Sequence, residues 1–189
     1  MVIGPVIDNG FYYDILSENP LTEKDLPLIE NRMRKLAKKN YTIRREVISK
    51  EDAIAIFKVR NEPYKVELLK EIPEDEVIAL YHHEEYIDMC RGPHLTNTKH
   101  VSAFKLMKMS GSYWKGDSSN QALTRVYGTA WETQESLDSY LKSLEEAEKS
   151  DHRILGKKLD LFHFQEESPG MVFWHDKGWT IFNLIKDYI

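Results

Sequence analysis

The spacing of hydrophobic and polar residues divides the chain near Val77. Before that point, apolar residues recur every three or four positions in stretches that follow Thr22 and Ser49. Both residues are typical helix N-caps, and acidic residues follow each of them in the first turn. We therefore expect one helix from Thr22 to about Asn40, a second helix from Ser49, and a third, short helix over 62–71.

After Val77 the pattern becomes that of short strands. Four such segments occur between residues 77 and 131, and turns rich in Gly, Pro, Asp and Ser separate them. The N-terminal sequence also predicts a hairpin, with its turn at Asn9-Gly10. Closely spaced strands favour antiparallel pairing, so we predict an α+β fold in which helices pack on an antiparallel sheet formed mainly from residues 77–131.

The last third of the chain has a different organisation. Leu137, Tyr140, Leu141 and Leu144 share one face of a charged helix predicted from Thr133 to about Leu155. The aromatic-rich residues beyond it are too few to close a core, and we expect them to open a second domain. The predicted divisions are a first domain over 1–132, a linker helix over 133–155, and the beginning of another domain over 156–189.

Composition limits the classes of function. Of the 189 residues, 41% are hydrophobic, which is typical of a globular chain. No apolar run approaches the length of a membrane span, and the N-terminus does not resemble a signal peptide, so we expect no membrane association. A single cysteine forms no internal disulfide, which favours a reducing, cytoplasmic setting. The net charge of -5 argues against a nonspecific nucleic-acid binder.

One stretch does suit a nucleic-acid surface. Residues 99–115 carry four lysines and no acidic residue, with aromatic residues between them. The stretch predicts either a surface that stacks on single-stranded RNA or an ordinary pair of strands with solvated lysines. Its basic and aromatic members are Lys99, His100, Phe104, Lys105, Lys108, Tyr113, Trp114 and Lys115.

The only cysteine lies in the sequence Y-I-D-M-C-R-G-P-H, four residues before His94. Cys90 and His94 could bind a metal, but structural zinc needs four ligands, which His82, His83 or His100 would have to complete. They could form a nucleophile and its base, or line a pocket together with Asp88. They could also be a buried cysteine and a surface histidine. Alternation along a strand would place Asp88, Cys90 and Tyr86 on one face.

Four long motifs carry a resemblance to a known family. They are H-E-E-Y-I-D-M-C-R-G-P-H, F-K-L-M-K-M-S-G-S-Y-W-K-G-D, R-V-Y-G-T-A-W and P-G-M-V-F-W-H-D-K-G-W-T-I-F. Together with I-G-P-V-I-D-N-G-F-Y-Y-D at the start, they resemble bacterial-type threonyl-tRNA synthetase over essentially the whole chain. The resemblance implies most of an editing domain, a linker helix, and the opening of a class II catalytic domain.

The resemblance also implies the chemistry. The family ligates threonine to its tRNA with ATP, and its editing domain hydrolyses serine wrongly attached to that tRNA. Asp88, Cys90, His94 and Lys65 match catalytic or pocket residues of the editing site, and Tyr13 matches a tyrosine that contacts the terminal adenosine. An HxxxH motif of the family is absent from this sequence. We therefore expect impaired editing from the chain alone. The resemblance also implies that the ATP-binding residues and metal ligands of the catalytic domain lie beyond Ile189, so we expect no threonyl-adenylate formation.

The implied partners and cofactors follow from the same resemblance. The partner is the acceptor end of tRNA(Thr), with a homodimer formed through the catalytic domain. No cofactor or metal is expected within this chain, whereas ATP, magnesium and zinc are implied for the catalytic domain. Two other functions stay open at this point: a free-standing trans-editing protein and a noncatalytic RNA-binding module. The catalytic-domain motif near Gly178 argues against the first of them.

Overall fold

The computed structural model describes residues 2–17, 19 and 21–189, which form two compact units, Met1–Leu137 and Asp138–Ile189. Each unit is considered by itself. Every strand pairing in the described residues is antiparallel. The predicted class, helices combined with antiparallel strands, is therefore confirmed. The elements of the first unit are β1 (Val6–Ile7), β2 (Gly10–Ile15), α1 (Leu26–Ala37), β3 (Arg44–Ile48), α2 (Lys50–Val59), α3 (Pro63–Glu71), β4 (Ile78–His83), β5 (Tyr86–Met89), β6 (Ala103–Tyr113) and β7 (Ala122–Trp131).

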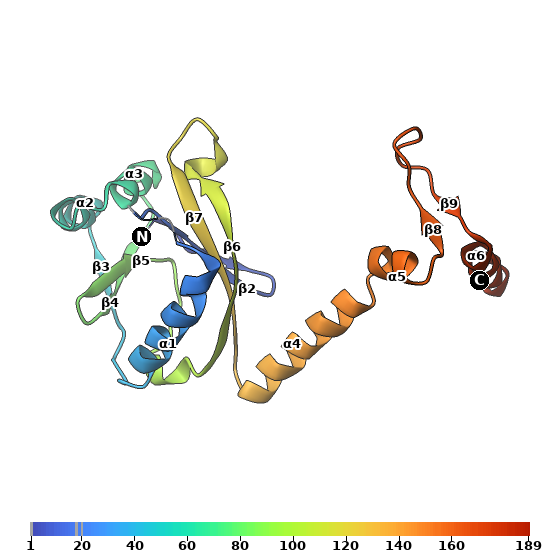
Figure 1. The fold of residues 1–189 in the computed structure, drawn as a ribbon. Coiled ribbons are helices and arrows are strands. Elements are labelled where there is room, and N and C mark those ends of the chain that lie inside the picture. Colours follow the sequence, from blue (N-terminus) through green and yellow to red (C-terminus); the bar gives the residue numbers. More distant parts are fainter. Residues whose placement is uncertain (1, 18, 20) are drawn as a thin grey trace. The chain divides into compact units, whose positions relative to one another are not determined.

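The first unit contains two sheets where the sequence predicted one. The four-stranded sheet has the order β1-β2-β7-β6, and the three-stranded sheet has the order β3-β4-β5. Figure 1 shows β3, β4 and β5 as a group separate from β2, β6 and β7. The strands predicted within 77–131 are thus shared between two sheets. The expectation of one sheet was wrong because β2 and β3, which lie outside that range, pair with β7 and β4 through contacts distant in sequence. Local hydrophobic patterns do not report such pairings.

The N-terminal hairpin forms, but its turn lies one residue earlier than predicted. Ile7 pairs with Gly10, so the two-residue loop consists of Asp8 and Asn9, and Gly10 is the first residue of β2. A side chain at Gly10 would meet the carbonyl oxygen of Gly128 on β7. This close approach of two backbones explains why a glycine stands inside the strand.

Helix α1 packs on one face of the four-stranded sheet. Its N-terminal side begins as the sequence predicted: Thr22 and Asp25 form a capping box around a short 3-10 helix, Glu23–Asp25, which leads into α1. Leu26 of the helix is buried against Leu106 and Val126 of the sheet. Strand β2 also turns Phe11 and Ile15 toward this core, so the intervening Tyr13 points to the same side.

The other two helices cover the three-stranded sheet. Ser49 caps α2 as predicted, with its hydroxyl accepting from the backbone N–H of Asp52. Helix α3 begins after Glu62, within the range expected for the short third helix. The side chains of α2, α3 and the sheet form one apolar core. Its buried members are Ala53, Phe57, Val66, Leu69, Ile78 and Leu80.

The helix predicted over 133–155 is two helices, α4 (Gln134–Lys149) and α5 (His152–Lys158). Asp151 separates them because its backbone leaves the helical conformation and its carboxylate accepts from the N–H of Arg153, which caps α5. The boundary between the compact units falls within α4, after Leu137. The predicted start of the long helix at Thr133 agrees with the structure, and its predicted continuity was wrong.

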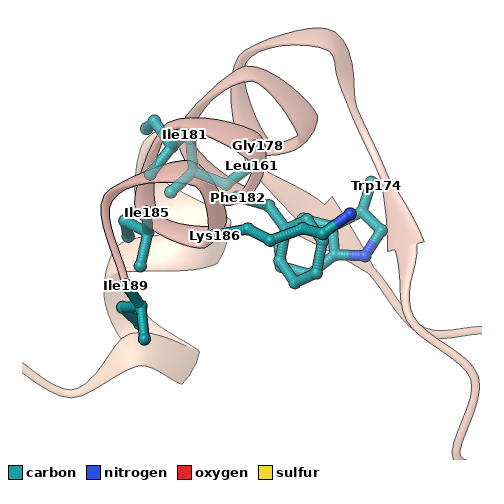
Figure 2. A pocket seen from close by; sticks show the side chains of 8 residues that line it. All are labelled: Leu161, Trp174, Gly178, Ile181, Phe182, Ile185, Lys186 and Ile189. Atoms are coloured by element: carbon teal, nitrogen blue, oxygen red, sulfur yellow. The ribbon is translucent and has the colours of Figure 1, made fainter.

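The second unit also contains β8 (Phe162–His163), β9 (Phe173–Trp174) and α6 (Asp176–Tyr188). Helix α6 and the short hairpin line an open apolar cavity of about 410 Å³ (Figure 2). Several large apolar side chains of α6 are exposed, among them Leu184 at 66% and Ile185 at 55%. The unit therefore leaves much of its apolar surface uncovered. None of the described helices has the length and apolar character needed to cross a bilayer.

Candidate functional site

Asp88 on β5 is the centre of a closed hydrogen-bond network. Its Oδ2 accepts from the hydroxyls of Tyr13 at 2.8 Å and Tyr86 at 2.9 Å. Its Oδ1 lies 2.9 Å from the ammonium of Lys65 and accepts from the backbone N–H of Met89 at 2.9 Å. A carboxylate offers about four acceptor positions, and here all four are used. The side chain is still 21% exposed, so the network reaches the surface.

Lys65 reaches Asp88 from the face of β5 opposite to the one on which the Asp88 side chain lies. Its side chain is only 1% exposed, although it starts on α3, which packs on the opposite face of the sheet. The ammonium passes the edge strand β5 and lies 2.6 Å from Glu62 Oε2, 2.9 Å from Asp88 Oδ1 and 3.5 Å from the carbonyl oxygen of Ile87. An ammonium has three N–H donors, and these three oxygens take them. Lys65 is therefore placed to orient Asp88.

The network shifts the pKa values of its members. Burial alone would raise the pKa of Asp88, but the hydrogen bond and charge of Lys65, with the two tyrosine hydroxyls, hold it below its ordinary value. Burial, followed by the negative charge of Asp88, raises the pKa of Tyr13 and of Tyr86 far above the ordinary value. Asp88 is therefore ionised and both tyrosines are neutral at pH 7. Both hydroxyls keep lone pairs that can accept a hydrogen bond.

Strand β2 brings Tyr13 to the three-stranded sheet. The neighbouring Asp14 is 3% exposed and receives two hydrogen bonds from Arg125 on β7, at 2.7 and 2.8 Å. This bidentate pair fixes β2 on β7. Gly4 lies against the Tyr13 ring, and a side chain at that position would collide with the ring. The hydroxyl of Tyr13 lies 3.2 Å from that of Tyr86, so two sheets meet at this site.

The turn after β5 carries Cys90 and His94. Gly92 has a φ of 75° and lies so close to the Tyr81 hydroxyl that any side chain would collide with it. The turn returns His94 onto the Tyr81 ring, with 3.8 Å between ring centroids. Tyr81 is the cross-strand partner of Asp88. Burial lowers the pKa of His94, and the charge of Asp88 opposes this shift only in part, so His94 is largely neutral at pH 7.

Cys90 lies apart from the network. It follows the last residue of β5 and is exposed, so the alternative of a buried core cysteine was wrong. Its sulfur accepts from the N–H of Gly92 at 3.3 Å. In the described part of the chain, no three side chains of the His, Cys, Asp and Glu types are grouped to hold a metal ion. The structure therefore does not group His82, His83 or His100 with Cys90 and His94 as a ligand set.

Two aromatic rings of the basic stretch 99–115 are buried. Phe104 and Trp114 are 1% and 7% exposed, so their rings cannot stack on bases. Lys105 lies 3.5 Å from a carboxylate oxygen of Glu30, and Lys115 pairs with two carboxylates of α3. Burial and ion pairing thus account for Phe104, Trp114, Lys105 and Lys115, whereas Tyr113 is 44% exposed. They weaken the observation that favoured a noncatalytic RNA-binding module.

The structure thus brings Lys65, Asp88 and Tyr13 into one network and stacks His94 on the neighbouring Tyr81 ring, while the sulfur of Cys90 accepts from the N–H of Gly92 in the turn. The catalytic roles of these residues stay predictions. Sequence reasoning did not single out Glu62, although its position three residues before a helical lysine is a known pairing distance. It also did not single out Tyr81.

Comparisons with known proteins agree on the family. Residues 78–127 match the model of the "Threonyl and Alanyl tRNA synthetase second additional domain". The whole chain is 57%, 58% and 59% identical to proteins named threonine--tRNA ligase from the Prochlorococcus marinus strains MIT 9211, MIT 9215 and MIT 9301. In each case the 189 aligned residues span 30% of the relative's length. By its sequence, the chain belongs to the threonyl-tRNA synthetase family and corresponds to a part of its members.

Proposed function

We propose that this chain contains the editing site of a threonine--tRNA ligase, which hydrolyses serine wrongly esterified to tRNA(Thr). The observation that carries the proposal is the network around Asp88. A buried lysine and two tyrosine hydroxyls hold one carboxylate, and His94 stacks on the ring of Tyr81 in the neighbouring strand β4. Both Asp88 and His94 fall within the segment that matches the synthetase additional domain.

The need for such a site follows from the chemistry of the two amino acids. Threonine differs from serine by one methyl group, and one methyl group in a pocket provides only about 1–3 kcal/mol of discrimination. A site that selects threonine through its hydroxyl and amine therefore also accepts some serine. A second site that fits serine and excludes the extra methyl group removes the error.

The geometry suggests a division of roles. Asp88 has no free acceptor position, so it acts by orienting the hydroxyls of Tyr13 and Tyr86. The hydroxyl oxygens can then accept hydrogen bonds from the attacking water, the terminal ribose or the amino group of the seryl ester. His94, neutral at pH 7, is the group suited to take a proton from the water. Lys65 keeps Asp88 in place, and Cys90 lies in the turn beside His94.

The activity of the whole enzyme is part of the same proposal. In a complete ligase, a catalytic domain would attach threonine to its tRNA with ATP, and the acceptor end of tRNA(Thr) would reach the editing site. The homodimer expected through the catalytic domain also belongs here. ATP, magnesium and zinc would serve that domain, and the roles given above to the Asp88 network do not involve them.

The test uses a full-length ligase in which residues 1–189 replace the matching region of a relative. Tyr13→Phe and Asp88→Asn are compared with the parent for hydrolysis of seryl-tRNA(Thr), and threonylation measured in parallel reports folding. Loss of one positioning contact can cost about 10²-fold, so we expect deacylation to fall about that far. Deacylation at the parental rate in both variants would show that the Asp88 network is not the site.

A further inference from the structure

We propose that Glu62 is a positioning residue of this site, which holds the Lys65 ammonium against Asp88. The inference rests on the proposed editing function and extends it to a residue that does not touch the substrate. Glu62 stands at the junction of α2 and α3, and its side chain is 17% exposed. Its carboxylate provides the shortest of the three contacts of Lys65, 2.6 Å to Oε2.

The position of Glu62 in the fold is unusual for a glutamate. It occupies the N-cap of α3, yet its side chain makes no capping hydrogen bond. Pro63 follows at the first helical position and has no N–H to satisfy. The carboxylate is therefore left for Lys65, one helical turn later. The carboxylate of this N-cap residue thus contacts a lysine side chain instead of the helix backbone.

A second cation fixes Glu62 from the other side. Arg60 donates from Nε to Glu62 Oε1 at 2.9 Å, and its Nη1 donates to the carbonyl oxygen of Glu85 at 3.1 Å. Glu85 lies in the turn between β4 and β5, so Arg60 ties the helix junction to the strand that carries Asp88. One oxygen of Glu62 thus pairs with Arg60 and the other with Lys65. Because Arg60 fixes Glu62, the ammonium of Lys65 is held at a defined distance from the carboxylate of Asp88.

Without Glu62, Lys65 would keep one carboxylate partner and one weak contact to a carbonyl oxygen. A lysine stem has four rotatable bonds, so its ammonium would no longer be held on the line between two anions. Asp88 would then move with it, and the hydroxyls of Tyr13 and Tyr86 would lose their fixed direction. Because a displacement of about 1 Å can cost 10²-fold in rate, a residue two contacts from the substrate can still control hydrolysis.

Three variants separate positioning from charge and from stability. Glu62→Gln keeps an acceptor oxygen at the same reach, Glu62→Asp keeps the charge but withdraws the oxygen by one methylene, and Glu62→Ala removes both. The matched control is Glu67→Gln, because Glu67 also lies on α3 and also pairs with a lysine, Lys115, but on the exposed surface. All four are made in the full-length ligase and assayed for deacylation of seryl-tRNA(Thr).

We expect Glu62→Ala and Glu62→Asp to lower kcat of deacylation roughly 10- to 100-fold with little change in KM. Glu62→Gln should stay within about threefold of the parent, and Glu67→Gln should be unchanged, because exposed pairs contribute little. Glu62→Asp at the parental rate would overturn the proposal. So would an equal loss in Glu62→Gln and Glu62→Asp, because that would indicate a requirement for more than the acceptor's position.

A spectroscopic measurement keeps this inference separate from the proposed function. In the 189-residue chain labelled with ¹⁵N-lysine, the buried Lys65 ammonium should give a signal that exchanges slowly with water. Glu62→Asp should speed that exchange at least tenfold, whereas Glu67→Gln should leave it unchanged. If the parent does not hydrolyse seryl-tRNA(Thr), the editing proposal fails while the exchange result still tests Glu62. An unchanged Lys65 signal in Glu62→Asp would refute the positioning role.

Discussion

Replacing Lys65 by methionine tests the energetic basis of the network. The substitution keeps an unbranched apolar side chain of nearly the same length and removes the charge and the N–H donors. It leaves Asp88 and Glu62 as two carboxylates without their shared cation. The lysine is 1% exposed, so water cannot replace the ammonium without rearrangement of the site.

The expected magnitude follows from burial. Removing one partner of a buried ion pair typically destabilises a protein by about 3–5 kcal/mol. Asp88 and Glu62 are 21% and 17% exposed, and Arg60 still pairs with Glu62, so part of the cost is relieved. We therefore expect a loss of about 3 kcal/mol in the free energy of unfolding. For a unit of this size, such a loss lowers Tm by roughly 10 °C.

The assay is urea denaturation of the 189-residue chain, followed by circular dichroism and by tryptophan fluorescence, to which the buried Trp114 and three other tryptophans contribute. Lys115→Met is the control, because Lys115 also pairs with two carboxylates, but its side chain is 37% exposed. We expect little change for Lys115→Met. Equal destabilisation by the two substitutions would show that burial does not set the strength of the Lys65 pairs, and would refute the reasoning.

Three further predictions follow from the same structure. Tyr86→Phe removes one of the two tyrosine hydroxyls that donate to Asp88, and it should slow deacylation about tenfold, because hydrogen bonds to charged groups contribute about 1.5–3 kcal/mol. The control Tyr12→Phe, on the other face of β2, should not change the rate. The pKa of His94 is lowered, so the neutral imidazole is lost only as the pH falls through a value below about 6.5. The deacylation rate should therefore rise with pH and reach a plateau by about pH 7. His94→Gln should abolish this loss of rate at acidic pH. Leu80→Ala, at a fully buried core position, should cost about 2–5 kcal/mol in the free energy of unfolding, whereas Val59→Ala, at 89% exposure, should cost none that urea denaturation can measure.

Local chemistry made part of the fold predictable from the sequence. The helix starts at Thr22, Ser49 and Glu62 depend on neighbouring residues, and the structure places helices at each. The separation of the strands into two sheets depends on pairings distant in sequence, such as Tyr13 with Val126, which no local pattern records. The break at Asp151 was missed because residues 145–153 are almost entirely polar, so hydrophobic spacing does not report there whether one helix continues or two meet.

The candidate site shows the same division. The alternation of Tyr86 and Asp88 on one strand face could be read from the sequence, and their hydrogen bond agrees with it. The role of Glu62 could not be read from the sequence, because it depends on the packing of α3 against the sheet. This packing lets Lys65, from one face of the sheet, reach the carboxylate of Asp88 on the other face. Cys90 did not join the network because β5 ends at Met89, before the alternation reaches it.

The most direct test of the central claim compares two esters of one tRNA. The full-length ligase carrying residues 1–189 is incubated, without ATP, with seryl-tRNA(Thr) and separately with threonyl-tRNA(Thr) at matched tRNA and salt. The account predicts rapid hydrolysis of the seryl ester, little hydrolysis of the threonyl ester, and loss of the seryl activity by about 10²-fold in Asp88→Asn. Equal hydrolysis of the two esters, or seryl hydrolysis that Asp88→Asn leaves intact, would contradict it.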